Sequence, residues 1–399
     1  MSEKIIKFPK IFLAPKRDVA VRRFHPWVFS GAIKKFEGHA KDGDVVEVFD
    51  AKGEYLATGH YHKGSIMVRI FSFEKTDGGL DFWQKKLQKA VDYRHKLGLI
   101  DSENTNCYRL MHGEGDGAPG LVIDIYGNTA VIQCHSIGMH QERDKLAAAL
   151  QEIYGEKLTA IYDKSAESLP PNYAATIQNG YLFGNFSDKA VKENGHLFQV
   201  NWETGQKTGF FLDQRFNRQA LTAFCQNKRV LNAFCYSGGF SVYALAAGAQ
   251  LVHSVDISQK AIDLTNENVA INQFNTEKHE AFTADVLKFL QETTTQYEVM
   301  VVDPPAYAKS MSKRHNAVQG YKRLNAAAFE KIAPGGILFT FSCSQVVDKT
   351  LFYNTITAAA IEAGRTVKVM AHLSQPADHP VSLFHPEGAY LKGLVLFVE

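Results

Sequence analysis

The stretch "RVLNAFCYSGGFSVYALAAG", residues 229–248, decides the fold class of the second half of the chain. An apolar, β-prone run ends at Cys235, a glycine pair follows at Gly238 and Gly239, and an apolar helical stretch comes next. Four further strand-like runs, most of them separated by helical stretches, span residues 251–256, 281–285, 297–303 and 336–342. Strands alternating with helices at this spacing predict an α/β domain with a parallel, doubly wound sheet. Ligands of such sheets bind beyond the carboxyl ends of the strands.

The first half of the chain has a different pattern. Residues 11–73 are short alternating runs separated by Asp-Gly and Lys-Gly turns, which predict a compact β-rich unit. Residues 80–98 carry apolar side chains at helical spacing and end at Gly98. Strand-like and helical stretches from Arg109 to Phe186 predict a small α+β domain. We therefore expect three domains, over residues 1–76, 77–190 and 191–399.

Charge and cysteine content narrow the class of protein. Residues 1–76 hold 14 Lys/Arg against 9 Asp/Glu, a net of +5 within a chain of net charge +2, which fits either a polyanionic partner or a solvated face. The five cysteines include no C-x-x-C pair, so neither a disulfide framework nor a zinc site is expected. A reducing cytoplasm is the simplest location. No run of about 18 apolar residues predicts a membrane span.

The glycine pair predicts where a cofactor could approach the sheet. Gly238 and Gly239 permit positive φ and close backbone approach, and the following helix start offers free N–H groups. The third glycine of G-x-G-x-x-G is absent, which disfavours a dinucleotide. A purely structural turn remains the alternative.

Two carboxylates follow the next strands. Asp256 ends the second strand, where a carboxylate can accept hydrogen bonds from both ribose hydroxyls of an adenosine; an exposed acid near a helix start is the alternative. Asp285 ends the third strand and suits either the exocyclic amino group of adenine or the N-cap of a helix, and the sequence leaves both open.

The fourth and fifth strands carry the candidate catalytic residues. Asp303 follows a buried strand, and Pro304 and Pro305 stiffen the chain directly after it, which suits precise holding of a planar base. Cys343 comes just past the fifth strand, so its thiol should open onto the same sheet edge. A lone cysteine is more often a small buried hydrophobe, but its neighbours here favour a nucleophile. His25 and His112 lie in Gly- or Pro-flanked turns and receive no role.

These motifs resemble the class I S-adenosylmethionine-dependent methyltransferases. The segments "FCYSGGFSVYAL", "VVDPPAYAKS", "LFTFSCSQ" and "QPADHPVSLFHPEGAYLKG" together look like the bacterial 23S ribosomal RNA cytosine-5 methyltransferases, which combine a PUA domain, a small α+β middle domain and a Rossmann-like catalytic domain. "HPWVFSGAI" is similar to the PUA opening, and "GQKTGFFLDQR" (205–215) to the segment that leads into the cofactor pocket.

The resemblance implies roles for individual residues. S-adenosylmethionine is expected on Gly238, Gly239, Asp256 and Asp285, with the adjoining Phe234 and Tyr236. Cys343 is the expected nucleophile and Asp303 its partner on the base. Substrate contacts are expected from residues that follow Asp303: Pro304, Pro305, Tyr307, Lys309 and Arg314. The last two belong to a basic segment that suits phosphates near the flipped nucleotide, and a solvated loop and helix face is the alternative.

The expected partner is 23S ribosomal RNA, naked or in a partly assembled large subunit. No membrane partner is expected, and a homodimer is left open. Related RNA cytosine-5 enzymes have a second cysteine after the D-x-P turn, where this chain has Ala306 and Tyr307. This matches the single-cysteine branch and leaves the group that removes the C5 proton unassigned.

Three other functions fit parts of the pattern. An amino-group methyltransferase would use D-P-P-x-Y, with Tyr307 stacked on the base, and needs no cysteine. An RNA-binding or assembly factor could keep the fold without catalysis. A nicotinamide dehydrogenase is disfavoured by the missing third glycine.

Overall fold

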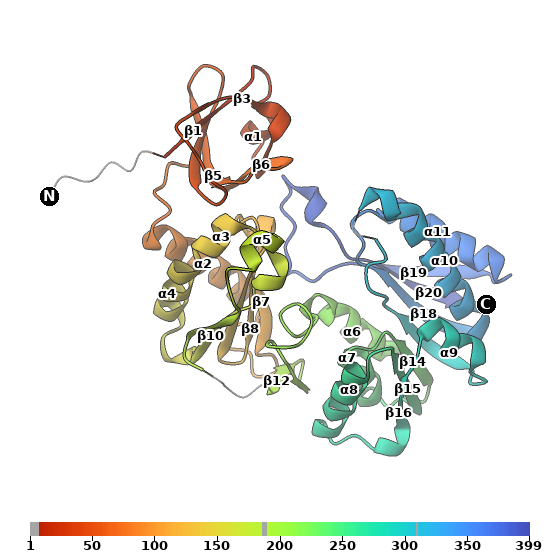
Figure 1. Ribbon diagram of the computed structural model, residues 1–399. Coiled ribbons are helices and arrows are strands. Elements are labelled where there is room, and N and C mark those ends of the chain that lie inside the picture. The colour runs from red at the N-terminus through yellow and green to blue at the C-terminus, as the bar shows by residue number, and fades with distance from the viewer. Residues whose placement is uncertain (1–7, 186–189, 309) are drawn as a thin grey trace. The chain divides into compact units, whose positions relative to one another are not determined.

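The computed structural model describes residues 8–185, 190–308 and 310–399 (Figure 1). The chain divides into two compact units, each assembled from segments distant in sequence. The first unit comprises Met1–Val191, Val200–Leu212 and Ala377–Gly388, and the second comprises Lys192–Gln199, Asp213–Pro376 and Ala389–Glu399. No helix among the described residues is long and apolar enough to cross a membrane.

The first unit begins with a six-stranded sheet in the order β2-β6-β5-β4-β1-β3. Alternate residues of its strands, such as Val46 and Val48 of β4, are buried in its own apolar core, as the alternating sequence predicts. The predicted β-rich unit is thereby confirmed. Its elements are β1 Lys10–Leu13, α1 Val19–Arg22, β2 Trp27–Phe29, β3 Ile33–Glu37, β4 Val45–Phe49, β5 Tyr55–Tyr61 and β6 Ile66–Ser72.

The same unit contains a five-stranded sheet in the order β11-β10-β9-β8-β7. The predicted helix is α2, which stops before Gly98, a glycine with φ of +69°. The run predicted to Phe186 is β11 in its described part, and Phe186 lies outside the described residues. The elements are α2 Leu80–Lys96, β7 Cys107–His112, β8 Leu121–Tyr126, β9 Thr129–Cys134, α3 Ile137–Gln141, α4 Arg143–Tyr154, β10 Ala160–Asp163, α5 Pro171–Ala174 and β11 Gly180–Phe183.

The Ala377–Gly388 segment is tied into the first unit by a buried arginine. Arg94 of α2 is fully buried and donates to both carboxylate oxygens of Asp116, at 2.6 and 2.7 Å. The same guanidinium donates to the carbonyl oxygen of Asp378 at 2.8 Å. A planar guanidinium can serve such a bidentate acceptor and a third acceptor at once. Arg94 therefore fixes the glycine-rich loop after β7 and this late segment of the chain together.

The second unit is built on a seven-stranded sheet in the order β16-β15-β14-β17-β18-β20-β19. Successive neighbours from β16 to β18 are parallel, and β20 pairs antiparallel with both β18 and β19. The strands are β14 Arg229–Ala233, β15 Leu251–Asp256, β16 His279–Thr283, β17 Tyr297–Val302, β18 Ile332–Ser342, β19 Val367–Leu373 and β20 Lys392–Val398. The helices are α6 Arg215–Leu221, α7 Gly239–Ala246, α8 Gln259–Ile271, α9 Val286–Glu292, α10 Arg314–Lys331 and α11 Lys349–Glu362. A separate two-stranded ribbon pairs β12 Ala190–Glu193 with β13 His196–Gln199.

This sheet is covered on both faces, as a doubly wound fold requires. In β17, Val299 and Val301 pack into a core with residues of α6, α7 and α8, whereas Met300 and Val302 pack into another with residues of α9, α10 and α11. Buried residues on both faces explain the continuous apolar run from which the strand was predicted. All five expected strands are present.

Two strands of this sheet, β19 and β20, were not predicted from the sequence. Six of the seven residues of β20 are buried, whereas β19 is an edge strand with five exposed residues and no buried one. An exposed edge strand gives little periodic signal, and β20 follows a segment that was interpreted only as a motif.

Candidate functional site

The glycine turn after β14 has an unusual backbone. Phe234, Tyr236 and Gly238 all have positive φ, at 60°, 47° and 72°. A Cβ added at Gly238 would lie 2.7 Å from Cγ2 of Thr265 on α8, so a side chain there would clash as well as strain the backbone. Strained backbone held by surrounding packing is characteristic of ligand-binding turns. Position 238 therefore accepts only glycine, and the turn leaves its backbone open to a ligand.

Asp256 holds this turn from the neighbouring strand. It is the last residue of β15, and its two carboxylate oxygens accept from the backbone N–H groups of Tyr236 and Ser258, at 3.1 and 2.9 Å. Its side chain stays partly exposed. Asp285 lies two residues beyond β16 rather than at its end, and caps α9 by accepting from the backbone N–H of Lys288 at 2.9 Å. The capping role left open by the sequence is thus present.

Asp303 follows β17 and is held by a chain of amides. Gln214 donates from Nε2 to Oδ2 of Asp303 at 2.9 Å, and Asn217 donates to Oε1 of Gln214 at 2.6 Å. Burial raises the pKa of Asp303 to about 7. The negative charge of Asp213 adds to this rise, while the hydrogen bond from Gln214 opposes it. Asp303 can therefore exchange a proton near neutral pH.

Cys343 lies beside Asp303 in the sheet order, directly after β18. Val302 pairs with Thr340 in the parallel ladder of β17 and β18, so the two strands end at the same edge. Cys343 is partly exposed, whereas the other four cysteines are buried. Burial, together with the charges of Asp303 and Asp213, raises the pKa of the Cys343 thiol to about 11. The structure thus brings the two expected catalytic residues together.

Four residues with contacts in this cluster were not given roles from the sequence. Asp213 accepts from the hydroxyl of Tyr390 at 2.7 Å, and Gln214 next to it holds Asp303. Lys392 begins β20 opposite Ser342, is buried, and donates to the carbonyl oxygen of Ser344 at 2.7 Å. All four residues lie in the two segments, 205–215 and 375–393, that resemble the methyltransferase family. This resemblance was the feature of the sequence that could have pointed to them.

Lys392 is the positive charge next to the thiol. Burial lowers the pKa of Lys392 to about 8, and the neighbouring Cys343 opposes this decrease. In return, Lys392 lowers the pKa of Cys343, against the effects of burial and of the two carboxylates. The thiol therefore lies in a balance of opposite charges.

The predicted substrate residues lie in different surroundings. Pro304 is buried and Pro305 is exposed. The ring of Tyr307 is tilted against that of Tyr321, with 4.7 Å between ring centroids. Arg314 begins α10 and forms an ion pair with Asp348 at 3.3 Å. Lys309 lies outside the described residues.

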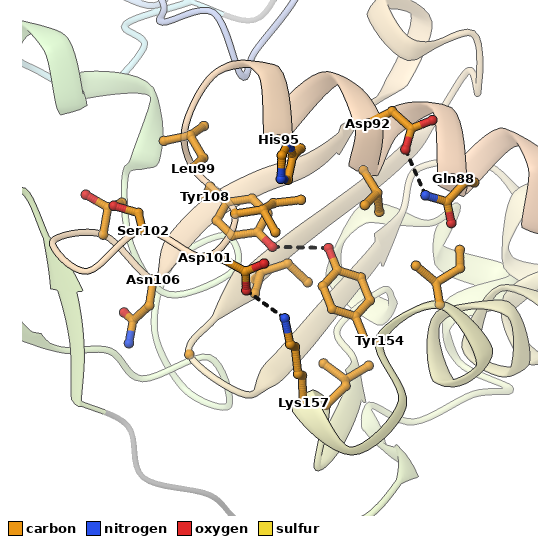
Figure 2. Close-up of a pocket in the computed structure, with 17 residues that line it drawn as sticks. Gln88, Asp92, His95, Leu99, Asp101, Ser102, Asn106, Tyr108, Tyr154 and Lys157 are labelled. Carbon is orange, nitrogen blue, oxygen red and sulfur yellow. Dashed lines mark hydrogen bonds and ion pairs between the residues drawn. The ribbon is translucent and has the colours of Figure 1, made fainter.

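A separate pocket of about 450 Å³ lies in the first unit, lined partly by α2 and α4 (Figure 2). The hydroxyl groups of Tyr108 and Tyr154 lie 3.1 Å apart in it, and Lys157 forms an ion pair with Asp101 at 2.7 Å. None of the site residues predicted from the sequence lines this pocket.

Comparison with known families agrees with this geometry. Residues 169–395, more than half of the chain, match the family described as S-adenosylmethionine-dependent methyltransferase, and residues 11–73 match a PUA-like domain. The fold and its strand-end residues thus define an enzyme that uses S-adenosylmethionine as methyl donor. Curated relatives named ribosomal RNA large subunit methyltransferase I are 40% identical: the Aeromonas hydrophila protein over 97% of this chain and 98% of its own, and the Photobacterium profundum protein over 98% and 99%. The chain belongs to the ribosomal RNA large subunit methyltransferase I family.

Solved structures share the fold over nearly the whole chain. A chain assigned as a SAM-dependent methyltransferase from Streptococcus mutans has a TM-score of 0.83 at 23% identity, covering 97% of this chain and 99% of its own. A methyltransferase complexed with SAH has a TM-score of 0.84 at 22% identity, with the same coverage.

The charge balance at Cys343 predicts opposite effects of two substitutions on thiol reactivity. Asp303→Asn removes a negative charge and should accelerate alkylation of Cys343 by iodoacetamide near pH 8, whereas Lys392→Met should slow it. Because alkylation follows the thiolate fraction, a shift of one pKa unit changes the rate about tenfold. The rate is measured by mass spectrometry of the Cys343 peptide, with Cys343→Ser identifying the signal. Equal rates in both variants would contradict the described electrostatics.

Proposed function

We propose that this enzyme methylates carbon 5 of a cytidine in 23S ribosomal RNA through a transient covalent bond between Cys343 and carbon 6 of the base. The observation that carries this proposal is the position of Cys343 and Asp303 at the ends of two adjacent parallel strands. The names of the full-length relatives support a large-subunit RNA as substrate. The PUA-like domain and the positive charge of residues 1–76 fit a polyanionic partner.

Carbon 5 of cytosine is too weak a nucleophile to take a methyl group directly. The Cys343 thiolate adds to carbon 6, and Asp303 in its protonated form donates to N3, so that the ring becomes an enamine nucleophilic at carbon 5. S-adenosylmethionine, when bound, supplies the electrophilic methyl group. After transfer, loss of the C5 proton supplies the electron pair of the C5–C6 double bond, the carbon–sulfur bond breaks with its electron pair returning to sulfur, and N3 returns its proton to Asp303.

Asp213 is the proton acceptor in this scheme. Its Oδ2 is held by Tyr390, whereas its buried Oδ1 has no hydrogen-bond partner within the described part of the chain. Its charge raises the pKa values of both Asp303 and Cys343, which reflects its nearness to the two reacting groups. Asp213 thus fills the role that a second cysteine has in related enzymes.

The cofactor lies across the carboxyl ends of β14 to β16 in this proposal. Gly238 and Gly239 line the methionine end, together with Phe234 and Tyr236 of the same turn. The side chain of Arg218 packs closely against this turn, because a Cβ added at Gly239 would lie 3.0 Å from Cδ of Arg218.

Two carboxylates complete the cofactor site. Asp256 takes the ribose hydroxyls, and Asp285 takes the adenine amino group in addition to its capping role. The partly exposed carboxylate of Asp256 at the end of β15 fits the ribose, because its backbone bonds leave lone pairs free on both oxygens.

The RNA contacts follow from the same edge of the sheet. Pro304 and Pro305 stiffen the turn that presents Asp303 to the flipped base. Tyr307 and Arg314 line the path of the RNA strand in this proposal, and Lys309, which lies outside the described residues, stays a predicted phosphate contact. The base must leave its stack to reach this edge, which costs least in unpaired RNA.

We assign the functional domains to residues 1–76, 77–190 and 191–399, with RNA binding in the first and methyl transfer in the last. Action on ribosomal RNA places the enzyme in the cytoplasm. The substrate is naked RNA or a partly assembled large subunit, and a homodimer is compatible with either.

An exocyclic-amino methyltransferase is the second candidate. Its D-P-P-x-Y turn would stack a tyrosine on the target base. Here Tyr307 packs against Tyr321 and is partly buried, which disfavours that role. A non-catalytic assembly factor would need neither the two carboxylates nor the lysine that surround the thiol of Cys343, so their presence disfavours this function.

Substitution of Cys343 separates these functions. Cys343→Ser should abolish methyl transfer to RNA from cells lacking the enzyme, because serine is a far weaker nucleophile, while binding of S-adenosylmethionine stays unchanged. RNA with 5-fluorocytidine at the target should become covalently attached to the wild type only. Near-normal turnover of the variant would favour nitrogen as acceptor, and failure of the wild type to bind the cofactor would favour the assembly factor.

The pKa values of Asp303 and Cys343 predict the pH dependence of kcat/KM. The thiolate fraction rises tenfold per pH unit below about 11, and the protonated fraction of Asp303 falls tenfold per unit above about 7. Their product rises up to about pH 7 and is level from about pH 7 to about pH 11. Asp303→Asn removes the dependence on the protonated fraction of residue 303. The kcat/KM of this variant, although lower, should therefore keep rising with the thiolate fraction between about pH 6 and pH 9. The same break in both proteins would contradict the assignment of Asp303.

Replacement of Asp213 should trap the covalent adduct. In Asp213→Asn the C5 proton has no acceptor, so turnover should fall by about 10²–10⁴-fold. A denaturant-resistant complex with unmodified RNA should accumulate on gels and carry label from the methyl donor. The double variant with Cys343→Ser is the control and should form no complex. Normal turnover without a complex would exclude Asp213 as the base.

A further inference from the structure

Three side chains able to bind a metal come together in the first unit. Across residues 8–185, 190–308 and 310–399, His25, His385 and Glu387 form the one group of at least three whose ligand atoms all lie within 4.8 Å of one another. Nε2 of His385 lies 3.9 Å from Oε2 of Glu387. His25 lies just before β2, whereas the other two belong to the Ala377–Gly388 segment.

His385 is the residue that most needs a ligand. Its side chain is 4% exposed, and neither ring nitrogen has a hydrogen-bond partner among the residues that the structure describes. Burying such a ring without a partner is costly. Its ring is fixed by aromatic neighbours, with centroid distances of 4.4 Å to Trp27 and 5.4 Å to His25.

His25 can present a free nitrogen to the same point. Its Nδ1 lies 3.3 Å from the carbonyl oxygen of Trp27 and 3.2 Å from the backbone nitrogen of the same residue, so Nδ1 either donates to the carbonyl or accepts from this N–H. Zinc binding through Nε2 would select the tautomer with the proton on Nδ1. The lone pair of Nε2 is then available. A ligating histidine usually donates its other N–H to a carbonyl or carboxylate in this way.

Negative charge surrounds the cluster. The carboxylate of Glu387 is exposed. Glu114 accepts at 2.9 Å from Nε1 of Trp27, whose ring packs against that of His385. These two carboxylates would balance the charge of one divalent cation.

We propose that His25, His385 and Glu387 bind one Zn²⁺ ion, with water as the fourth ligand. Two imidazoles and a carboxylate suit zinc better than magnesium or calcium. Tetrahedral zinc with bonds of about 2.0–2.1 Å places its ligand atoms roughly 3.4 Å apart. The ligand atoms, now within 4.8 Å of one another, would move closer on binding, and the exposed side chain of Glu387 is free to adjust.

The ion would fasten the Ala377–Gly388 segment to the N-terminal sheet. Arg94 fixes this segment near its start through Asp378, and the zinc would fix it near its end. The role is structural and independent of the methyl-transfer chemistry, so this inference goes beyond the proposed function.

The test uses the full-length protein, stripped with a chelator and dialysed against Zn²⁺. The wild type should retain one equivalent of zinc by mass spectrometry and unfold at a higher temperature with zinc than without it. His25→Ala and Glu387→Gln, which change less buried ligands, should bind zinc at least about tenfold more weakly and lose the thermal shift. His39→Ala and Glu156→Gln are exposed, matched controls and should behave as wild type.

Cobalt substitution identifies the ligands independently. Co²⁺ in this site should show weak visible bands without the intense thiolate-to-cobalt absorption that cysteine ligation produces. The proposal is overturned if the wild type retains no zinc, if His25→Ala and Glu387→Gln retain it as tightly as the controls, or if the cobalt spectrum shows thiolate ligation.

Discussion

The parallel pairing of β17 with β18 is the constraint on which the candidate site depends. Because Val302 lies opposite Thr340, both chains leave the sheet at one edge, and Asp303 and Cys343 follow within one and three residues of this pair. A shift of register by one residue would turn the side chains of a strand to the other face. The continuous apolar cores on both faces hold the register, so packing far from the site determines its geometry.

Strand β20, which pairs antiparallel with β18, brings a positive charge to the candidate site. It places Lys392 opposite Ser342, one residue before Cys343, and its ammonium group offsets two carboxylates near the thiol. With burial raising the pKa of Cys343 to about 11, the free enzyme holds mostly thiol, which is protected from oxidation and alkylation. In the proposed mechanism, the high proton affinity of sulfur also makes it a strong nucleophile once ionised.

The sequence predicted those parts of the fold that leave a local signal. Periodicity and turn residues indicated the five strands from β14 to β18, the β-rich unit and α2, and strand ends located Asp256, Asp303 and Cys343. Local pattern could not reveal β19, whose residues are largely exposed. It also could not separate the two uses of Asp285, since capping depends on the same residue type as ligand binding.

The residues that sequence reasoning could not place are those whose partners lie far along the chain. Gln214 meets Asp303 across 89 positions and Tyr390 meets Asp213 across 177. Neither pairing has a periodic signature, because loop residues are brought together only by the completed sheet. The resemblance to a known family indicated that segments 205–215 and 375–393 are functional, but it did not predict these contacts.

The absence of a second cysteine after the D-P-P turn bears on how the proposed cycle can close. In a two-cysteine site, a thiol can help release the product, but here Ala306 offers no proton acceptor and Tyr307 packs against Tyr321. The acceptor must then come from another element. Asp213 is adjacent in sequence to Gln214, so the loop that binds Asp303 also delivers a second carboxylate. Because the charge of Asp213 raises the pKa of Asp303, this loop also favours the protonated form of the carboxyl group that donates to N3 in the proposed cycle.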